Sequence, residues 1–205
     1  MWKMNRGHSD LTNWGLSHVS IEKCDTILDV GCGGGRTVSK LAAIATQGKV
    51  CGIDYSPDSV AASRKKNAPA IAAGRVEIQQ GTVSQLPFPD GTFDLVTAVE
   101  THFFWPNLPA DMREVFRVLK PGGSFIVIAE VYTGATRMLK KLTERERHAH
   151  LAMMKLLSVD EHRELFARTG YSEIRVIEER DKEWLCGIGK KPLLPEISAG
   201  AQKQV

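Results

Sequence analysis

The chain has 205 residues and a formal net charge of +3, and 25% of its residues are charged. The length suits one domain with a core on both faces of a sheet. The ordinary charge balance gives no case for a nucleic-acid partner, and the four cysteines show no spacing typical of a zinc site or of a disulfide framework. Because no segment has the pattern of a signal peptide or of a membrane span of about 18 apolar residues, we expect a cytoplasmic protein.

The first predicted element is a helix over residues 10–19, with Ser9 as its N-cap. His8 lies in the segment that leads into this helix, and Trp14 lies on the helix itself. Packing of the helix on the edge of a sheet is the simpler explanation for Trp14. A lid over a ligand site, in which His8 and Trp14 contact the substrate, is the alternative.

The most informative pattern of the chain follows at residues 27–35. An apolar run interrupted by Asp29 leads into glycines at 31, 33 and 35, and a helical stretch over 36–45 comes directly after them. In α/β proteins, a buried strand, a tight turn and a helix start together form a nucleotide-sized site. Glycines let the backbone approach a ligand closely and adopt positive φ angles. The pattern therefore predicts a ligand-binding loop at the carboxyl end of the first strand.

The spacing of the glycines indicates which nucleotide this loop binds. A dinucleotide fingerprint starting at Gly31 would require its third glycine at position 36, where the chain has Arg36. Together with Asp29 the glycines instead form the pattern D-x-G-x-G-x-G, in which the chain resembles the class I S-adenosylmethionine-dependent methyltransferases. The resemblance implies S-adenosylmethionine as the cofactor, with Asp29 near its ammonium group. It also implies that the loop residues Gly31, Cys32 and Gly33 contact the cofactor.

The next apolar strand, residues 49–54, ends in Asp54 about 20 residues after the glycine loop. A carboxylate at this place in a Rossmann-like sheet accepts hydrogen bonds from the ribose hydroxyls of a nucleotide. Because NAD also contains ribose, Asp54 does not distinguish between the two cofactors. Tyr55 either lies against the adenine or is a half-buried aromatic at the strand end. Ser56 then caps the following helix, with Pro57 at its first position.

A third strand is predicted over residues 75–79, and Thr82 and Val83 follow it. In the methyltransferase family, an Asp that accepts a hydrogen bond from the adenine amino group often stands at the position of Thr82. A hydroxyl accepts this bond more weakly than a carboxylate, so the backbone at Val83 is an alternative contact. We predict that both residues take part in binding the adenine.

The fourth strand, residues 92–99, runs into a loop that the resemblance places near the methyl group. His102 is the candidate general base, since an imidazole accepts a proton near neutral pH. A loop histidine bonded to backbone is the alternative for it. Glu100 is the second catalytic candidate, or it accepts hydrogen bonds from the methionine end of the cofactor. Phe103 and Trp105 either form an aromatic wall for the substrate or pack the cap.

The rest of the chain supplies further helices and strands and one amphipathic segment. These elements are predicted over residues 112–120, 124–129, 158–168, 173–179 and 184–188. Residues 132–157 are rich in methionine and are predicted as a helical cap over an apolar pocket, with ordinary core packing as the alternative.

Strands that alternate with helices imply a mostly parallel sheet with right-handed crossovers. The short polar turn between the last two strands predicts a hairpin, and the resemblance implies that the last strand is antiparallel and lies beside the fifth. The expected fold class is α/β, a Rossmann-like seven-stranded sheet with helices on both faces and a C-terminal antiparallel hairpin strand. One methyltransferase domain would comprise residues 1–197, with residues 1–22 as a helical lid and residues 198–205 as a disordered tail.

The blocks LPFPDGTFD and REVFRVLKPGG are most similar to the quinone and sterol methyltransferases. The resemblance therefore implies in-line transfer of a methyl group to a small organic acceptor without a metal. Such a transfer depends mainly on positioning and on exclusion of water. An NAD(P)-dependent oxidoreductase and a non-catalytic cofactor-binding protein of the same fold are the alternatives. The expected partner is a small-molecule acceptor, with no nucleic acid and no membrane span.

Overall fold

A computed structural model describes residues 7–135 and 143–193. Within them, seven strands form one sheet in the order β3-β2-β1-β4-β5-β7-β6. The strands are β1 (Thr26–Val30), β2 (Lys49–Asp54), β3 (Val76–Gln80), β4 (Phe93–Val99), β5 (Leu119–Ala129), β6 (Ser172–Glu179) and β7 (Trp184–Lys190). The first five strands pair in parallel, and β7 lies antiparallel between β5 and β6. The predicted Rossmann-like α/β sheet with a C-terminal antiparallel hairpin is confirmed.

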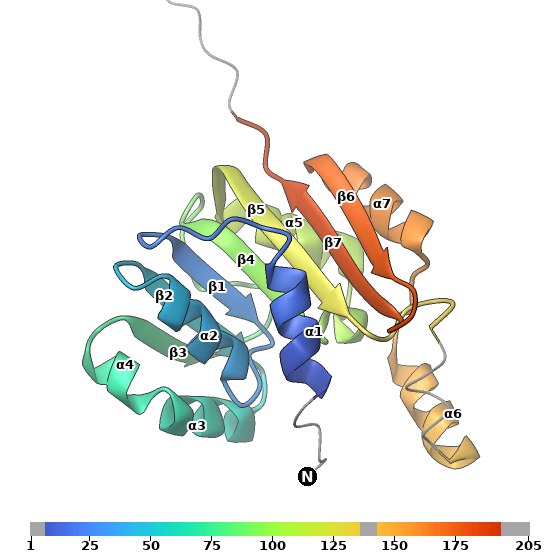
Figure 1. The fold of residues 1–205 in the computed structure, drawn as a ribbon, viewed down its shortest axis with the longest axis horizontal. Coiled ribbons are helices and arrows are strands. Elements are labelled where there is room, and N and C mark those ends of the chain that lie inside the picture. The colour runs from blue at the N-terminus through green and yellow to red at the C-terminus, as the bar shows by residue number, and fades with distance from the viewer. Residues whose placement is uncertain (1–6, 136–142, 194–205) are drawn as a thin grey trace, which may run out of the picture.

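Helices cover both faces of the sheet (Figure 1). They are α1 (Gly7–Leu16), α2 (Arg36–Ile44), α3 (Pro57–Lys66), α4 (Ala68–Ala72), the 3-10 helix η1 (His102–Phe104), α5 (Leu108–Val118), α6 (Glu144–Met153) and α7 (Val159–Arg168). Successive residues of a strand point to opposite faces. Ile27 therefore joins a cluster with Leu41 of α2, whereas Leu28 joins one with Met112 of α5 and Phe166 of α7. Apolar layers thus cover both faces of the sheet. The parallel strands all have their carboxyl ends at the same edge.

The N-terminal helix begins earlier than the sequence indicates, which corrects the prediction that Ser9 is its N-cap. Ser9 lies inside α1, and its carbonyl and hydroxyl oxygens accept hydrogen bonds from Lys40 Nζ of α2 at 2.8 and 2.9 Å. A Cβ on Gly15 would lie 2.4 Å from the Ile128 side chain of β5. The helix therefore packs directly on the sheet and is attached to the helix that follows the glycine loop.

The helix predicted over residues 112–120 is shifted toward the N-terminus. It begins at Leu108 because the Asn107 side chain accepts a hydrogen bond from Ala110 N at 3.3 Å, with Pro109 in the first turn. It ends at Val118, and the next residue, Leu119, is already extended and pairs with Phe93 of β4. The fifth strand thus starts before the two glycines.

The predicted cap over residues 132–157 contains α6, which lies beyond the sheet in Figure 1. Residues 136–142 of this cap, residues 1–6 of the predicted lid and the predicted tail 198–205 lie outside the described residues. The proposed boundaries of the domain, lid and cap stay predictions. None of the helices in the described part of the chain is both long enough and apolar enough to cross a membrane.

Candidate cofactor and active site

Three acidic side chains meet at the carboxyl edge of the sheet. Asp29 lies on β1, Asp54 ends β2, and Glu100 follows β4 directly. Because β1 pairs in parallel with both β2 and β4, these three strand ends are neighbours. In open α/β sheets, ligands bind outside the carboxyl ends of the strands where the strand order reverses, which here is between β1 and β4.

The loop between β1 and α2 requires glycine at its first and last positions. Gly31, Gly33 and Gly35 all have positive φ angles, of 73°, 49° and 76°. A Cβ on Gly31 would lie 2.2 Å from the Thr101 hydroxyl, and a Cβ on Gly35 would lie 2.3 Å from the Ser63 hydroxyl. No atom lies within 4 Å of a Cβ built on Gly33, so the outer side of the loop there is open. Alternating glycines therefore serve close packing at the ends of the loop and an open approach at its centre.

Asp29 is buried beneath the glycine loop, with 2% of its surface exposed. Its Oδ1 accepts a hydrogen bond from the Thr97 hydroxyl of β4 at 2.6 Å. Burial raises the pKa of Asp29 to about 7, although the bond from Thr97 acts in the opposite direction. A buried carboxyl group held near its ionisation point favours a cationic ligand group, because a nearby positive charge stabilises the carboxylate.

Asp54 connects the end of β2 to the glycine loop and to the start of α3. Its Oδ2 accepts a hydrogen bond from Gly33 N at 2.8 Å, and its Oδ1 accepts one from Ser56 N at 2.9 Å. The Ser56 hydroxyl in turn accepts from Ser59 N at 3.3 Å and caps α3, as predicted. The carboxylate is therefore fixed in orientation beside the open centre of the loop.

Glu100 has a strained backbone and a side chain that joins two strand ends. Its φ is 57°, which is uncommon for a residue other than glycine, and such strain concentrates at functional sites. Its Oε1 accepts a hydrogen bond from Glu130 N at 2.5 Å, just beyond β5. Burial of the carboxyl group, followed by repulsion from Glu130, raises the pKa of Glu100 to about 8. Like Asp29, Glu100 is thus a buried carboxyl group that favours a cationic ligand group at this edge of the sheet.

His102 is buried, with 2% of its surface exposed, and lies in η1 directly after the site residues Glu100 and Thr101. Its Nε2 lies 3.0 Å from Nε2 of His162 on α7, while its Nδ1 is buried and has no hydrogen-bond partner within residues 7–135 and 143–193. Burial, followed by the electrostatic effect of His162, lowers the pKa of His102 well below its usual value. The ring is therefore neutral near pH 7, and the burial that keeps it neutral also opposes its protonation.

The residues predicted to bind the adenine lie around the end of β3 and the start of α3. Tyr55 is 78% exposed, so its ring is free to stack on a base. Thr82 is exposed, whereas the Val83 side chain is buried in the core, which leaves only its backbone for a ligand. The Cys32 side chain is also buried, 3.9 Å from the Ser63 hydroxyl, and burial raises the pKa of its thiol to about 12. Cys32 therefore reaches a ligand through its backbone alone.

The predicted substrate residues are placed in packing roles where the structure describes them. Trp14 packs against Trp184 of β7, with ring centroids 5.8 Å apart. Phe103 is buried with Val131 and Met154, and Trp105 stacks on Phe125 at 6.0 Å. Of the two explanations offered for these aromatic residues, the structure supports packing of the sheet and the cap. His8 lies in α1, and its side chain is outside the described set.

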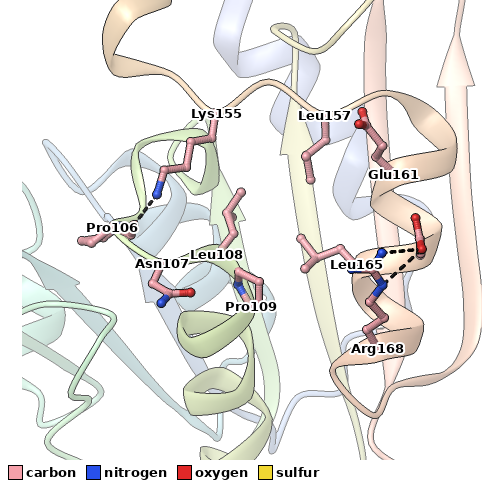
Figure 2. Close-up of a pocket in the computed structure, with 10 residues that line it drawn as sticks. Pro106, Asn107, Leu108, Pro109, Lys155, Leu157, Glu161, Leu165 and Arg168 are labelled. Atoms are coloured by element: carbon pink, nitrogen blue, oxygen red, sulfur yellow. Dashed lines mark hydrogen bonds and ion pairs between the residues drawn. The ribbon is translucent and has the colours of Figure 1, made fainter.

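A cavity of about 510 Å³ opens beside this edge, between the start of α5, the segment before α7 and α7 itself. Figure 2 shows Lys155 extending toward Pro106 on one side of it, with Leu157 and Leu165 on the other. None of the predicted site residues lines this cavity. It belongs to the α5 and α7 face rather than to the glycine loop.

Sequence reasoning missed three contributors to the site, namely Thr97, Glu130 and His162. A threonine between apolar residues of the fourth strand was a usable signal for Thr97, because buried polar side chains require a partner. The other two come from distant segments, 30 and 60 residues from their partners, and no local pattern marks them.

Comparison with known sequences agrees with the geometry. Residues 28–127 match a family model described as a methyltransferase domain. The chain is 40% identical over 105 residues to demethylmenaquinone methyltransferase of Symbiobacterium thermophilum, which covers 51% of this chain and 42% of that protein. It is 36% identical over 147 residues to fatty-acid O-methyltransferase of Mycolicibacterium smegmatis, which covers 70% of this chain and 50% of that protein. The chain thus spans about half the length of these relatives or less.

Solved structures share the fold at lower sequence identity. A chain in the complex of the Haloferax volcanii Trm112 methyltransferase activator matches with a TM-score of 0.76 and 23% identity, covering 90% of both chains. The [4+2]-cyclase SpnF matches with a TM-score of 0.70 and 18% identity, covering 90% of this chain and 82% of that one. The matched methyltransferase domain begins on β1 and ends in β5, and so contains the glycine loop and all three acidic strand ends. The chain therefore belongs to the class I S-adenosylmethionine-dependent methyltransferases.

Proposed function

We propose that this protein transfers a methyl group from S-adenosylmethionine to a small organic acceptor by in-line displacement. The observation that carries the proposal is the set of acidic strand ends around an open glycine loop. Asp54, held beside the loop by its bond from Gly33 N, would accept hydrogen bonds from the ribose, and the buried carboxyl groups of Asp29 and Glu100 would favour the cationic amino-acid end of the cofactor. A dinucleotide would instead place its pyrophosphate at the loop, where the acidic strand ends repel an anion once they are ionised.

The same arrangement suggests where the adenine ring and the methyl group of the cofactor would lie. The adenine would lie between Tyr55 and the backbone of Thr82 and Val83. The methyl group would then point toward the loop after β4, where His102 lies. The transfer depends mainly on positioning, because the sulfonium carries its own leaving group, the neutral thioether. A general base is needed only where the acceptor must lose a proton, and His102 is the candidate.

The relatives support a small acceptor without identifying it. The two quoted above are named for a quinone precursor and a fatty acid, and a sterol 4-C-methyltransferase of Caenorhabditis elegans is 36% identical over 100 residues. That match covers 49% of this chain and 29% of the nematode protein. The fold alone does not fix the reaction, since a protein named a cyclase shares it.

Parallel calorimetric titrations with S-adenosylmethionine, S-adenosylhomocysteine and NAD test the cofactor. We expect saturable binding of the first two and none of NAD. Formation of S-adenosylhomocysteine in the presence of candidate acceptors then tests turnover. Binding of NAD alone would overturn the methyltransferase assignment, and cofactor binding without turnover on any acceptor class would favour a non-catalytic protein.

A further inference from the structure

Two histidines that are far apart in sequence form a buried pair beside the proposed methyl-transfer site. His102 lies in η1 and His162 in the second turn of α7, and each is 2% exposed. Their Nε2 atoms are 3.0 Å apart, which is a hydrogen-bond distance. The residue just before η1, Thr101, contacts the glycine loop, because its hydroxyl occupies the space where a Cβ on Gly31 would lie.

The hydrogen bonds of His162 determine where its proton is. Its Nδ1 lies 2.7 Å from the Ser158 carbonyl oxygen, which can only accept, so Nδ1 carries the proton. Burial lowers the pKa of His162, which keeps the ring neutral near pH 7. In a neutral imidazole the other nitrogen is an acceptor. Nε2 of His162 therefore accepts the hydrogen bond from His102.

The tautomer of His102 follows from that of its partner. Since His162 Nε2 accepts, His102 Nε2 must carry the proton and donate it. The lone pair of His102 then lies on Nδ1, which is buried and has no partner among the described residues. An unsatisfied buried polar atom is costly, and one that persists beside a reaction site is a candidate for use by a substrate.

Resting on the proposed function, we propose that His162 is a positioning residue that holds His102 in the tautomer whose Nδ1 accepts a proton from a hydroxyl acceptor. In the reaction, the hydroxyl oxygen bonds to the methyl carbon and the carbon–sulfur bond breaks. The sulfur keeps the electron pair and leaves as S-adenosylhomocysteine, while the hydroxyl proton moves to His102 Nδ1. The imidazolium keeps its Nε2 hydrogen bond to His162 and loses the proton to water after the product departs.

Long-range proton–nitrogen correlation spectra of the histidine rings test the tautomer on the full chain without any substrate. At pH 7 we expect His102 to be neutral with its proton on Nε2, and His162 to be neutral with its proton on Nδ1. A His102 that carries its proton on Nδ1, or that is an imidazolium at pH 7, would overturn the proposal.

Variants at His162 separate positioning from general stability. His162→Gln keeps an acceptor oxygen near the former Nε2 and is expected to preserve the His102 tautomer, whereas His162→Leu removes it and is expected to give a mixture. His148 is a matched control, because its Nδ1 makes the same contact with a carbonyl four residues earlier, Glu144, but the ring is exposed. His148→Leu should leave the His102 spectrum unchanged. An unchanged His102 tautomer in folded His162→Leu would contradict the positioning role.

Turnover tests the acceptor class. Formation of S-adenosylhomocysteine is measured with phenol, catechol and hydroquinone, and His162→Leu is expected to lower kcat on the fastest of them about tenfold to a hundredfold, within the range of general-base catalysis. The affinity for S-adenosylhomocysteine should stay unchanged, and His162→Gln should recover most of the rate. Turnover on none of the hydroxyl compounds would overturn the acceptor assignment. Saturable cofactor binding in the same sample would show that the proposed cofactor site survives that failure.

Discussion

Replacement of Asp54 by alanine tests the proposed ribose site and the organisation of the glycine loop together. In the structure, the Asp54 carboxylate accepts hydrogen bonds from Gly33 N at 2.8 Å and from Ser56 N at 2.9 Å. The variant leaves both donors without that acceptor, and water replaces it only in part, because Asp54 is 7% exposed. Removal of hydrogen bonds to a charged group costs about 1–3 kcal/mol, so we expect the free energy of unfolding to fall by an amount on this scale.

The affinity for S-adenosylhomocysteine should fall on the same scale, because the ribose hydroxyls lose their acceptor as well. A loss of about 1–3 kcal/mol corresponds to about a 5- to 150-fold increase in Kd. Calorimetric titration measures the affinity, and urea denaturation measures the stability. Asp58→Ala is the matched control, since it removes an exposed carboxylate from the first turn of α3. If folded Asp54→Ala bound the ligand as tightly as the Asp58→Ala control, the ribose assignment would be wrong.

Two further predictions concern the loop and the buried acids. Gly31→Ala should lower the melting temperature and abolish cofactor binding, because its Cβ would lie 2.2 Å from the Thr101 hydroxyl. The control Gly91→Ala, at a similar φ of 62° but in open space, should cost only backbone strain. Equal shifts of the melting temperature in the two variants would refute the steric argument. Asp29 and Glu100 ionise near pH 4 in the unfolded chain but at about pH 7 and about pH 8 in the folded protein, so folding takes up protons and their contribution to stability is lost as pH rises from about 4 to about 8. The cationic cofactor favours the ionised carboxylates, so its affinity should rise between pH 6 and pH 8 and its binding should release protons. Calorimetry in buffers of different ionisation enthalpy measures both effects. An affinity that stays constant over this range would contradict the placement of the ammonium group of the cofactor.

The sequence determined the order of the elements and the place of the cofactor loop, because these features depend on local patterns. Glycines with alternate spacing after an apolar strand predicted the loop, and the structure gives them positive φ angles. The cap residue Ser56 predicted the start of α3, where its side chain accepts a hydrogen bond from the first turn. Asp54 could be placed at a strand end because a strand boundary is itself a local signal.

Only the tertiary structure decided the roles that depend on contacts between distant segments. Trp14, Phe103 and Trp105 have the same sequence signature whether they line a pocket or pack a core, and the sheet buries the last two and packs Trp14 on its face. The start of α1 was misplaced, since Ser9 lies inside the helix and its hydroxyl oxygen accepts a hydrogen bond from Lys40, 31 residues away.

The pairing of His102 with His162 is the strongest example of what the fold adds. The position of His102 after the fourth strand identified it as a candidate base. The sequence could not predict which of its ring nitrogens carries the proton, because the tautomer depends on His162, 60 residues later, and on the hydrogen bond between His162 and the Ser158 carbonyl. Local patterns specify which residues end a strand, since they reflect the backbone of that segment alone. The protonation of a buried side chain reflects burial and partners, and these exist only once the segments have packed together.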